Sequence, residues 1–335
     1  MAKKKQIILT HDELIQLAKK EHAPYWVYTS PTVAPVGVGP AGSLFSLDPK
    51  FLEKTWLFVR VDLSDPSSRK LFEIALEWHR RYSMFPCSVL LIIHPRFEYY
   101  LKAKTIEEIL DHFSTRIPTV IDHELGFARL TGAKLGAHIN IVQKGAIIKT
   151  IPIGKVELSE MQAVERELQK SLRLTDPGLS LPFVFEPEDP AFFKTTVSSI
   201  DISETEKVKA MGLNLSGKWN IEANRITTQD STASITFNIP KNSTPLGLMI
   251  CAEPIDPKSL GAAFILEVNG TAPTDSMLGS EARYDEVQNA ICTFKQPGSF
   301  IVLKNLVQGR HDTVTMKIPL AGNKPIAIYG FRFFS

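Results

Sequence analysis

The hydrophobic pattern of this chain differs on the two sides of a proline-rich segment near its middle. Within residues 174–195 a continuous helix is excluded by four prolines and a glycine, namely Pro177, Gly178, Pro182, Pro187 and Pro190. Before this segment, apolar runs alternate with stretches of helical periodicity; after it, short stretches alternate apolar and polar residues. We therefore predict two domains of different fold class joined by a linker at 174–195. The length of 335 residues allows each domain its own core.

The first half of the chain predicts an α/β domain over residues 23–173. Apolar runs at 56–63 and 88–93 flank a helical pattern at 69–81, and the three together make a βαβ unit. The elements that follow are a helix at 105–113, a strand at 118–122, a helix at 125–131, strands at 137–143 and 146–152, and a helix at 159–172. The hairpin signal Lys144-Gly145 gives the sheet an antiparallel edge. A helical extension at 1–22 is expected to precede this domain.

The second half predicts an all-β domain over residues 196–335. The stretches 235–239, 264–268, 314–318 and 326–334 alternate with the period of half-buried strands, and Asn269-Gly270 is a tight-turn signal. Short strands separated by turn residues favour a β-sandwich or jelly roll.

Composition narrows the classes of partner and compartment. A net charge of +2 gives no reason to expect nucleic acid, and no segment approaches the roughly 18 apolar residues of a membrane span. The apolar run at residues 7–9 is too short for the core of a signal peptide, so we expect a cytoplasmic protein. Three widely separated cysteines, Cys87, Cys251 and Cys292, form no Cys-x-x-Cys pair. Neither a disulfide framework nor a cysteine metal site is therefore expected.

Seven short segments occur along the chain in a recognisable order: His22-Ala-Pro-Tyr-Trp26, Val59-Arg-Val-Asp62, Trp78, Ile93-His-Pro-Arg-Phe-Glu98, Ile117-Pro-Thr-Val-Ile-Asp122, Leu215-Ser-Gly-Lys-Trp219 and Ile328-Tyr-Gly-Phe-Arg-Phe333. In order and spacing they resemble the soluble tail of DipZ-type thiol-disulfide oxidoreductases. In that family a TlpA-like thioredoxin domain precedes a jelly roll that is similar to carbohydrate-binding modules. The resemblance implies a thioredoxin-like domain followed by a jelly roll.

The family's active-site turn carries Cys-x-x-Cys, with a thiolate at a helix N-terminus. The matching residues here are Asp65-Pro66-Ser67-Ser68, and serine cannot form a disulfide. Ser64 or Asp65 suits a helix N-cap and Pro66 the first helical position. The family's cis-proline opposite this turn is matched by Gly136. The resemblance therefore implies a degenerate site that has lost its thiol-disulfide chemistry and needs no cofactor.

Rival sites for chemistry have weaker support in the sequence. Cys87 lies about a helix length from the turn, so packing is its expected role, with a redox-sensor role as the alternative. Asp122-His123-Glu124 offers possible metal ligands, but no partner has recognised spacing, so no metal is predicted. A catalytic triad of Ser67 or Ser68 with Asp65 and a distant histidine is conceivable, but no nucleophile-elbow sequence supports it.

In the second domain, Trp219, Arg283, Tyr284 and Asp285 could hold a sugar by ring stacking and hydrogen bonds. The competing interpretation places Trp219 in the core. Our preferred hypothesis is a non-enzymatic, redox-inactive binding or scaffold protein whose partner is a protein segment or a glycan. The alternatives are a thiol-dependent redox protein or sensor that uses Cys87, and a carbohydrate-binding protein with a structural thioredoxin domain.

Overall fold

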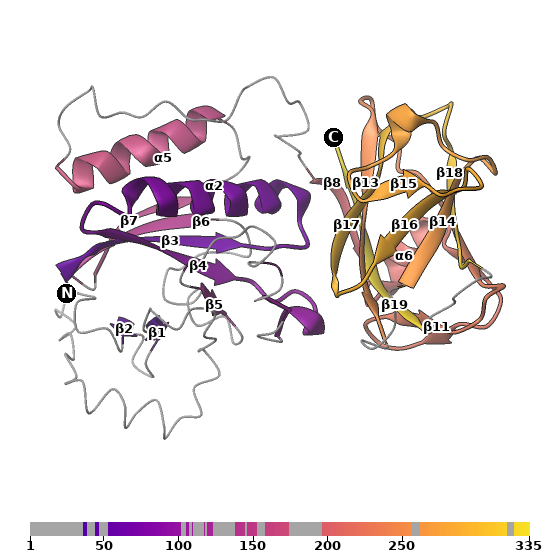
Figure 1. Ribbon diagram of the computed structural model, residues 1–335, viewed down its shortest axis with the longest axis horizontal. Helices are drawn as coiled ribbons and strands as arrows, with labels where there is room; N and C mark the ends of the chain where they lie inside the picture. The colour runs from indigo at the N-terminus through magenta and orange to yellow at the C-terminus, as the bar shows by residue number, and fades with distance from the viewer. Residues whose placement is uncertain are drawn as a thin grey trace. The chain divides into compact units, whose positions relative to one another are not determined.

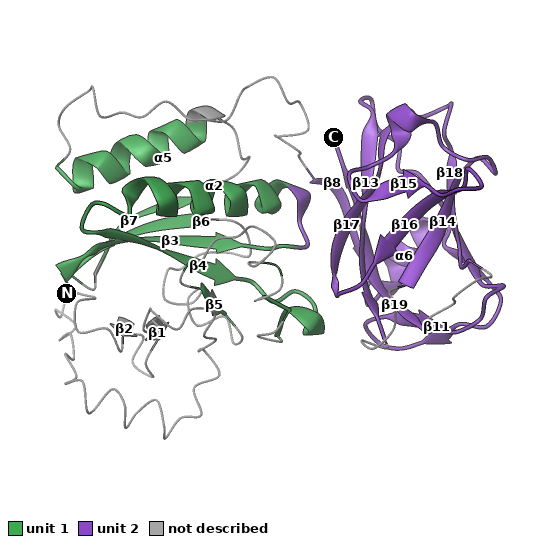
Figure 2. Cartoon of the chain, viewed as in Figure 1, with its two compact units in different colours: residues 1–63, 67–193 green, residues 64–66, 194–335 purple. Residues whose placement is uncertain are grey.

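The structure is a computed structural model of the chain. It describes residues 36–38, 44–46, 53–101, 105–106, 109, 117, 119–122, 138–144, 146–152, 158–173, 196–255, 262–319 and 325–335. The chain divides into two compact units (Figure 2). One comprises Met1–Leu63 and Ser67–Phe193, and the other Ser64–Pro66 and Lys194–Ser335. The predicted extension at 1–22, the linker at 174–195 and the helix at 125–131 lie outside the described residues.

The first unit contains a five-stranded sheet in the order β5-β4-β3-β6-β7. Its strands are β3 (Thr55–Val61), β4 (Cys87–Ile93), β5 (Thr119–Ile121), β6 (His138–Gln143) and β7 (Ala146–Pro152). Strands β3, β4 and β5 are parallel, whereas β6 and β7 add an antiparallel edge. The predicted α/β class and its antiparallel hairpin are confirmed, and the topology is thioredoxin-like. A separate two-stranded sheet pairs β1 (Val36–Val38) with β2 (Leu44–Ser46).

Two long helices lie side by side on one face of this sheet (Figure 1). Helix α2 (Pro66–Tyr82) follows β3, and α5 (Leu158–Ser171) follows β7. A buried hydrogen bond of 2.7 Å from the Tyr82 hydroxyl to Glu165 Oε1 joins the two helices. Gln169 donates to the same hydroxyl oxygen at 2.9 Å. A 3-10 turn, η2 (Glu98–Leu101), follows β4.

The second unit is a sandwich of two antiparallel sheets, which confirms the predicted all-β class. One sheet has the order β10-β11-β19-β13-β17, with β8 also paired to β19, and the other has the order β15-β16-β14-β18-β12-β9. The strands of the first sheet are β8 (Thr196–Asp201), β10 (Asn220–Ile221), β11 (Ile226–Thr228), β13 (Leu246–Pro254), β17 (Gly298–Leu306) and β19 (Ile326–Phe334). Those of the second are β9 (Asn214–Ser216), β12 (Ser234–Asn238), β14 (Ala262–Val268), β15 (Ala282–Tyr284), β16 (Ala290–Phe294) and β18 (Thr313–Lys317). Helix α6 (Thr205–Ala210) and the 3-10 turn η5 (Asp275–Met277) complete the unit.

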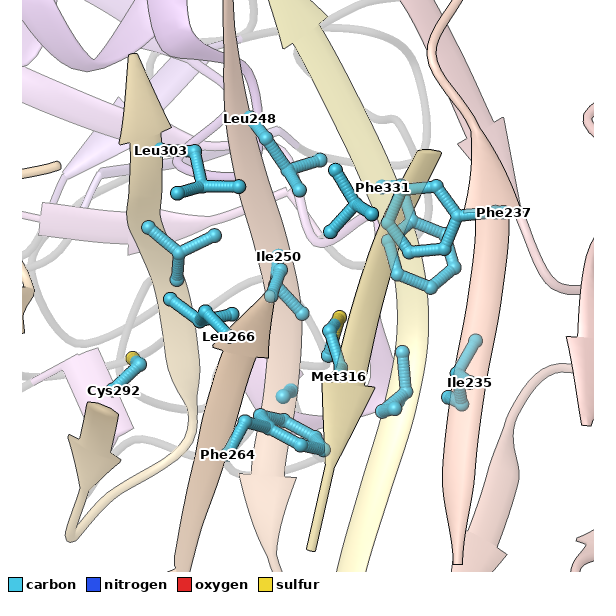
Figure 3. Packing of buried hydrophobic residues seen from close by; sticks show 14 of the residues in the cluster. Ile235, Phe237, Leu248, Ile250, Phe264, Leu266, Cys292, Leu303, Met316 and Phe331 are labelled. Carbon is cyan, nitrogen blue, oxygen red and sulfur yellow. The ribbon is translucent and has the colours of Figure 1, made fainter. Parts of the chain in front are cut away.

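Apolar side chains from both sheets fill the space between them (Figure 3). Leu248, Ile250 and Phe331 come from one sheet, and Phe237 and Phe264 come from the other. The rings of Phe237 and Phe331 have centroids 4.7 Å apart, in a tilted arrangement. Burial of alternate residues by this core accounts for the alternating pattern read in the sequence.

Candidate functional site

The segment Asp65–Ser68, which the sequence resemblance predicts to correspond to an active-site turn, lies at the start of a helix. Helix α2 begins at Pro66, as the capping signal predicts. Ser68, predicted from the resemblance to match the second thiol, is buried, and its Oγ accepts a hydrogen bond of 2.8 Å from the backbone N–H of Asp62. The Ser68 side chain therefore ties the first turn of α2 back to the end of β3.

A row of polar side chains crosses one face of the sheet beside this turn. Arg60 on β3 is in register with His138 on β6 and with Ile92 on β4. Residues in register point to the same face and residues two apart share a face, so His94 belongs to the face of Arg60. Asp122 belongs to it as well, because Val120 is in register with Ile92. Arg60, His138 and Asp122 are at most 3% exposed.

These side chains make specific contacts at the carboxyl ends of the parallel strands. Arg60 Nη2 lies 3.2 Å from His94 Nδ1, and Arg60 Nε lies 3.8 Å from Asp122 Oδ2. Arg96 Nη1 lies 3.7 Å from Asp62 Oδ2. We name Arg60, Asp62, His94, Arg96 and Asp122 the carboxyl-edge cluster. In open α/β sheets this edge is where ligands commonly bind.

Backbone hydrogen bonds hold the cluster's loops onto the strand ends. The N–H of His94 donates to the Val61 carbonyl at 2.8 Å, and the N–H of Asp122 donates to the Ile93 carbonyl at 2.9 Å. Each residue that follows a strand is thus fixed to the neighbouring strand. The positions of His94 and Asp122 are therefore set by the sheet rather than by the loops.

The cluster contains a histidine whose protonation is disfavoured. Burial lowers the pKa of His94; Asp62 and Asp122 oppose this effect, while Arg60 adds to it. An arginine can only donate, so Nδ1 of His94 must accept the hydrogen bond from Arg60. Burial likewise lowers the pKa of Arg60, opposed by Asp122 and Asp62, yet a guanidinium stays charged at any ordinary pH.

Cys87, the alternative redox residue, opens strand β4 and is buried and free. Burial raises the pKa of its thiol to about 12, with a smaller opposing effect from Lys54. A reactive cysteine needs the opposite shift together with exposure. Cys251 and Cys292 are also buried, and neither forms a disulfide. Burial raises the pKa of Cys292 to about 12.

Some predicted positions lie outside the described residues, namely Gly136, His123 and Glu124. Within the part of the chain that the structure describes, no three His, Cys, Asp or Glu side chains are grouped to hold a metal ion. Among the described helices, none combines the length and apolar character needed to cross a membrane.

The candidate sugar-binding residues divide between two places in the sandwich. Arg283 and Tyr284 lie on β15, an edge strand of one sheet, with Asp285 directly after it. Trp219 lies between β9, the opposite edge strand of that sheet, and β10, an edge strand of the other sheet. Trp219 is partly buried against the core, and its Nε1 donates to the Ser216 carbonyl at 2.9 Å. The structure therefore brings together Arg283, Tyr284 and Asp285 but not Trp219.

Asp285 has a local structural role beside Tyr284. Its Oδ1 accepts the N–H groups of Val287 at 3.0 Å and Asn289 at 2.8 Å. Partial desolvation raises the pKa of the Asp285 carboxyl, but these hydrogen bonds outweigh that effect and lower the pKa. The Tyr284 hydroxyl donates to the Pro273 carbonyl. Arg283 is the exposed member of the three.

Sequence reasoning did not single out Arg60, Asp62, His94 or Arg96 as a site. A signal was available, because Arg60 interrupts the apolar run of β3 and a charged residue within a buried strand needs a partner. The partner could not be named from the sequence, since it depends on the register between strands.

No family model matches the chain, and no curated protein matches it. Solved structures that match include a protein described as a thioredoxin from Neisseria meningitidis, with 16% identity and a TM-score of 0.34 over 44% of this chain and 92% of that one. Another is the exposed lipoprotein thioredoxin Etrx1 from Streptococcus pneumoniae, with 14% identity and a TM-score of 0.32 over 41% and 99%. A thioredoxin-family thiol:disulfide interchange protein from Chlorobium tepidum has 13% identity and a TM-score of 0.31 over 43% and 96%.

Proposed function

We propose that this protein is a redox-inactive, thioredoxin-like binding or scaffold protein, with a protein segment as the ligand of its first unit. The observation that supports the proposal is the buried hydroxyl of Ser68, which accepts a hydrogen bond from the Asp62 N–H. The sequence resemblance predicts that this residue corresponds to the second thiol of the family. A hydroxyl in this role stabilises the turn and cannot exchange disulfides.

An insulin-reduction assay on the purified full chain tests this proposal. We expect the wild-type rate to equal the rate without protein. The matched control is the double variant Asp65→Cys with Ser68→Cys, which restores a thiol pair at the start of α2 and is expected to gain activity. Substitution of both Ser67 and Ser68 by alanine shows whether any residual rate depends on these hydroxyls. Robust reduction by the wild type would overturn the proposal.

The alternative redox function through Cys87 has less support. Its buried thiol with a raised pKa is a poor nucleophile at neutral pH. Labelling with a maleimide distinguishes the two functions: we expect Cys87 to stay unlabelled in the folded protein and to react after denaturation. Rapid labelling of the folded protein would favour the sensor function instead.

The second unit is proposed as a ligand-binding module of jelly-roll type. Support comes from the β15 edge, where exposed Arg283 adjoins partly buried Tyr284 and Asp285. Glycan-array binding that is lost in Arg283→Ala would support a sugar ligand, with Trp219→Ala as the comparison at the opposite edge. Absence of glycan binding would leave the module with a protein ligand.

We further propose that the protein works in a reducing compartment such as the cytoplasm. The three buried cysteines support this location, since none of them forms a disulfide that needs an oxidising environment. Fractionation of cells that express the tagged native protein tests it, and recovery from the periplasm would contradict it.

A further inference from the structure

The contact between Arg60 and His94 depends on the protonation state of the imidazole. The guanidinium donates from Nη2, so His94 Nδ1 must present a lone pair at 3.2 Å. A proton on Nδ1 would remove that acceptor and place a second cation beside Arg60. The two states of His94 therefore cannot share one geometry.

The groups that face His94 come from several elements. Arg60 and Asp62 belong to β3 and the residue after it, Asp122 follows β5, and Arg96 lies in the same loop as His94. His138 on β6 is in register with Arg60 and buried. The carboxylates favour a protonated His94 and the two arginines oppose it, so the balance depends on small movements of these groups.

His94 is also attached to the former active-site turn. Its backbone N–H donates to the Val61 carbonyl at the end of β3, and Asp62 is the residue that follows Val61. Asp62 in turn contacts Arg96 through its carboxylate and Ser68 through its N–H. A displacement of His94 would therefore be transmitted to the first turn of α2 through two hydrogen bonds, His94 to Val61 and Asp62 to Ser68.

We propose that His94 is a proton-operated latch. The neutral imidazole accepts from Arg60 and keeps the end of β4 against the end of β3; a proton taken from solvent onto Nδ1 breaks this hydrogen bond, repels Arg60 and loosens the turn from Asp62 to Ser68. The latch is a property of the fold itself. Its test reads backbone opening and needs no ligand, so its failure is distinguishable from failure of the proposed binding function.

The direction of the effect follows from linkage. A histidine freed from the cluster has a pKa of about 6.5, and burial lowers the value in the closed state. The open state then binds more protons, so the closed state weakens as pH falls below about 6.5. The weakening reaches at most about tenfold per pH unit and stops below the closed-state pKa.

Hydrogen exchange of the full chain between pH 7.5 and 5, corrected for the intrinsic rate, tests the latch. We expect protection in peptides covering residues 61–68 and 88–96 to fall several-fold below about pH 6.5. NMR of histidine-labelled protein should show the His94 ring titrating below that value. In His94→Gln the amide oxygen can accept from Arg60 but does not titrate. Protection from hydrogen exchange in this variant should therefore not depend on pH, whatever its absolute value.

His311→Gln is the matched control. His311 Nδ1 also accepts a backbone N–H, that of Val307 at 2.8 Å, but it lies in the second unit. It should leave the pH profile of the first unit unchanged. The latch is overturned if the His94 ring titrates at or above about 6.5 without loss of protection, or if His94→Gln keeps the wild-type pH profile. The wild-type measurement decides the matter even if the variant does not fold.

Discussion

Each unit of the protein buries an arginine on a central strand, and the two arginines are held in different ways. The side chains of Arg60 in β3 and Arg332 in β19 are both 1% exposed. Arg332 donates to Asp201 at 2.5 Å and to the carbonyls of Phe331 at 2.9 Å and Ile200 at 3.3 Å. Arg60 instead lies 3.8 Å from Asp122 and shares a hydrogen bond with His94.

The difference separates a structural anchor from a group that can respond to pH. The backbone carbonyls that accept from Arg332 never titrate, so those hydrogen bonds stay in place across the physiological range. Arg60 depends on a histidine, the side chain most readily protonated near neutral pH. The same residue type therefore stabilises one unit and, in the other, places a titratable contact next to the turn that begins α2.

The largest effect is expected from the apolar core of the second unit. Phe331→Ala removes a fully buried ring that contacts Phe237, and Phe333 belongs to the same buried cluster. We expect a loss of about 4 kcal/mol in the free energy of unfolding. Urea unfolding followed by circular dichroism measures it. Phe300→Ala, at a position only partly buried against the core, is the control and should cost clearly less. Equal losses would show that packing between the sheets does not dominate this unit.

Removal of the partner of Arg332 is expected to have the next largest effect. Asp201→Ala leaves a buried guanidinium without its carboxylate, which costs about 3 kcal/mol. If Arg332 is an anchor, the loss measured by urea unfolding should be the same at pH 7.5 and pH 5.5. Glu206→Ala is the control, because that carboxylate is 88% exposed in its pair with Lys209 and should contribute nothing measurable. A loss that changes strongly with pH would make the two arginines alike.

Several of the described elements in both units were predictable because their signals are local. The run at 56–63 corresponds to β3 at Thr55–Val61, and the helical pattern at 69–81 to the longer α2 at Pro66–Tyr82. The predicted Asn269-Gly270 turn has φ of 52° and 77°, as a tight hairpin turn requires. Hydrophobic periodicity and turn-forming residues are signals that extend over only a few positions, so they can be recognised directly in the sequence.

The carboxyl-edge cluster could not be predicted in the same way. Arg60 and His94 are separated by 34 positions, and their contact exists because Val61 is in register with Ile93. A shift of one residue in that register would turn Arg60 to the other face of the sheet. Likewise Trp219 and Arg283 were grouped by residue type, although Arg283 lies on the edge strand β15 and Trp219 lies between the edge strands β9 and β10.

A smaller effect is expected at the turn itself. Ser68→Ala removes the acceptor of the Asp62 N–H and should cost about 1.5 kcal/mol, together with faster hydrogen exchange at residues 61–68. Ser67→Ala, which changes a partly exposed neighbour, is the control. The difference between the two variants shows whether the turn between β3 and α2 is held by one hydroxyl. Unchanged exchange in Ser68→Ala would mean that it is not.

The smallest effect is expected at Glu165, a second buried titratable group of the first unit. Burial raises the pKa of its carboxyl, partly opposed by the hydrogen bond from Tyr82 and by Arg81. A raised pKa in the folded state means that its contribution to stability is fully present below the unfolded value of about 4.3 and is lost as pH rises through the folded value. Glu165→Gln keeps the acceptor for Tyr82 and removes the charge. At pH 7 the free energy of unfolding of this variant should equal that of the wild type or exceed it by up to about 1 kcal/mol, and the difference should vanish near pH 4.

The matched control for this substitution lies on the same helix and should have the opposite sign. Hydrogen bonds from Lys149 and Lys170 lower the pKa of Glu167, so its contribution is present at neutral pH and lost as pH falls through the lowered value. Glu167→Gln should therefore be slightly less stable than the wild type at pH 7 and indistinguishable from it in acid. If Glu165→Gln instead proves strongly destabilising at pH 7, the Glu165 charge is an anchor like that of Asp201. The first unit would then hold its buried charges as rigidly as the second.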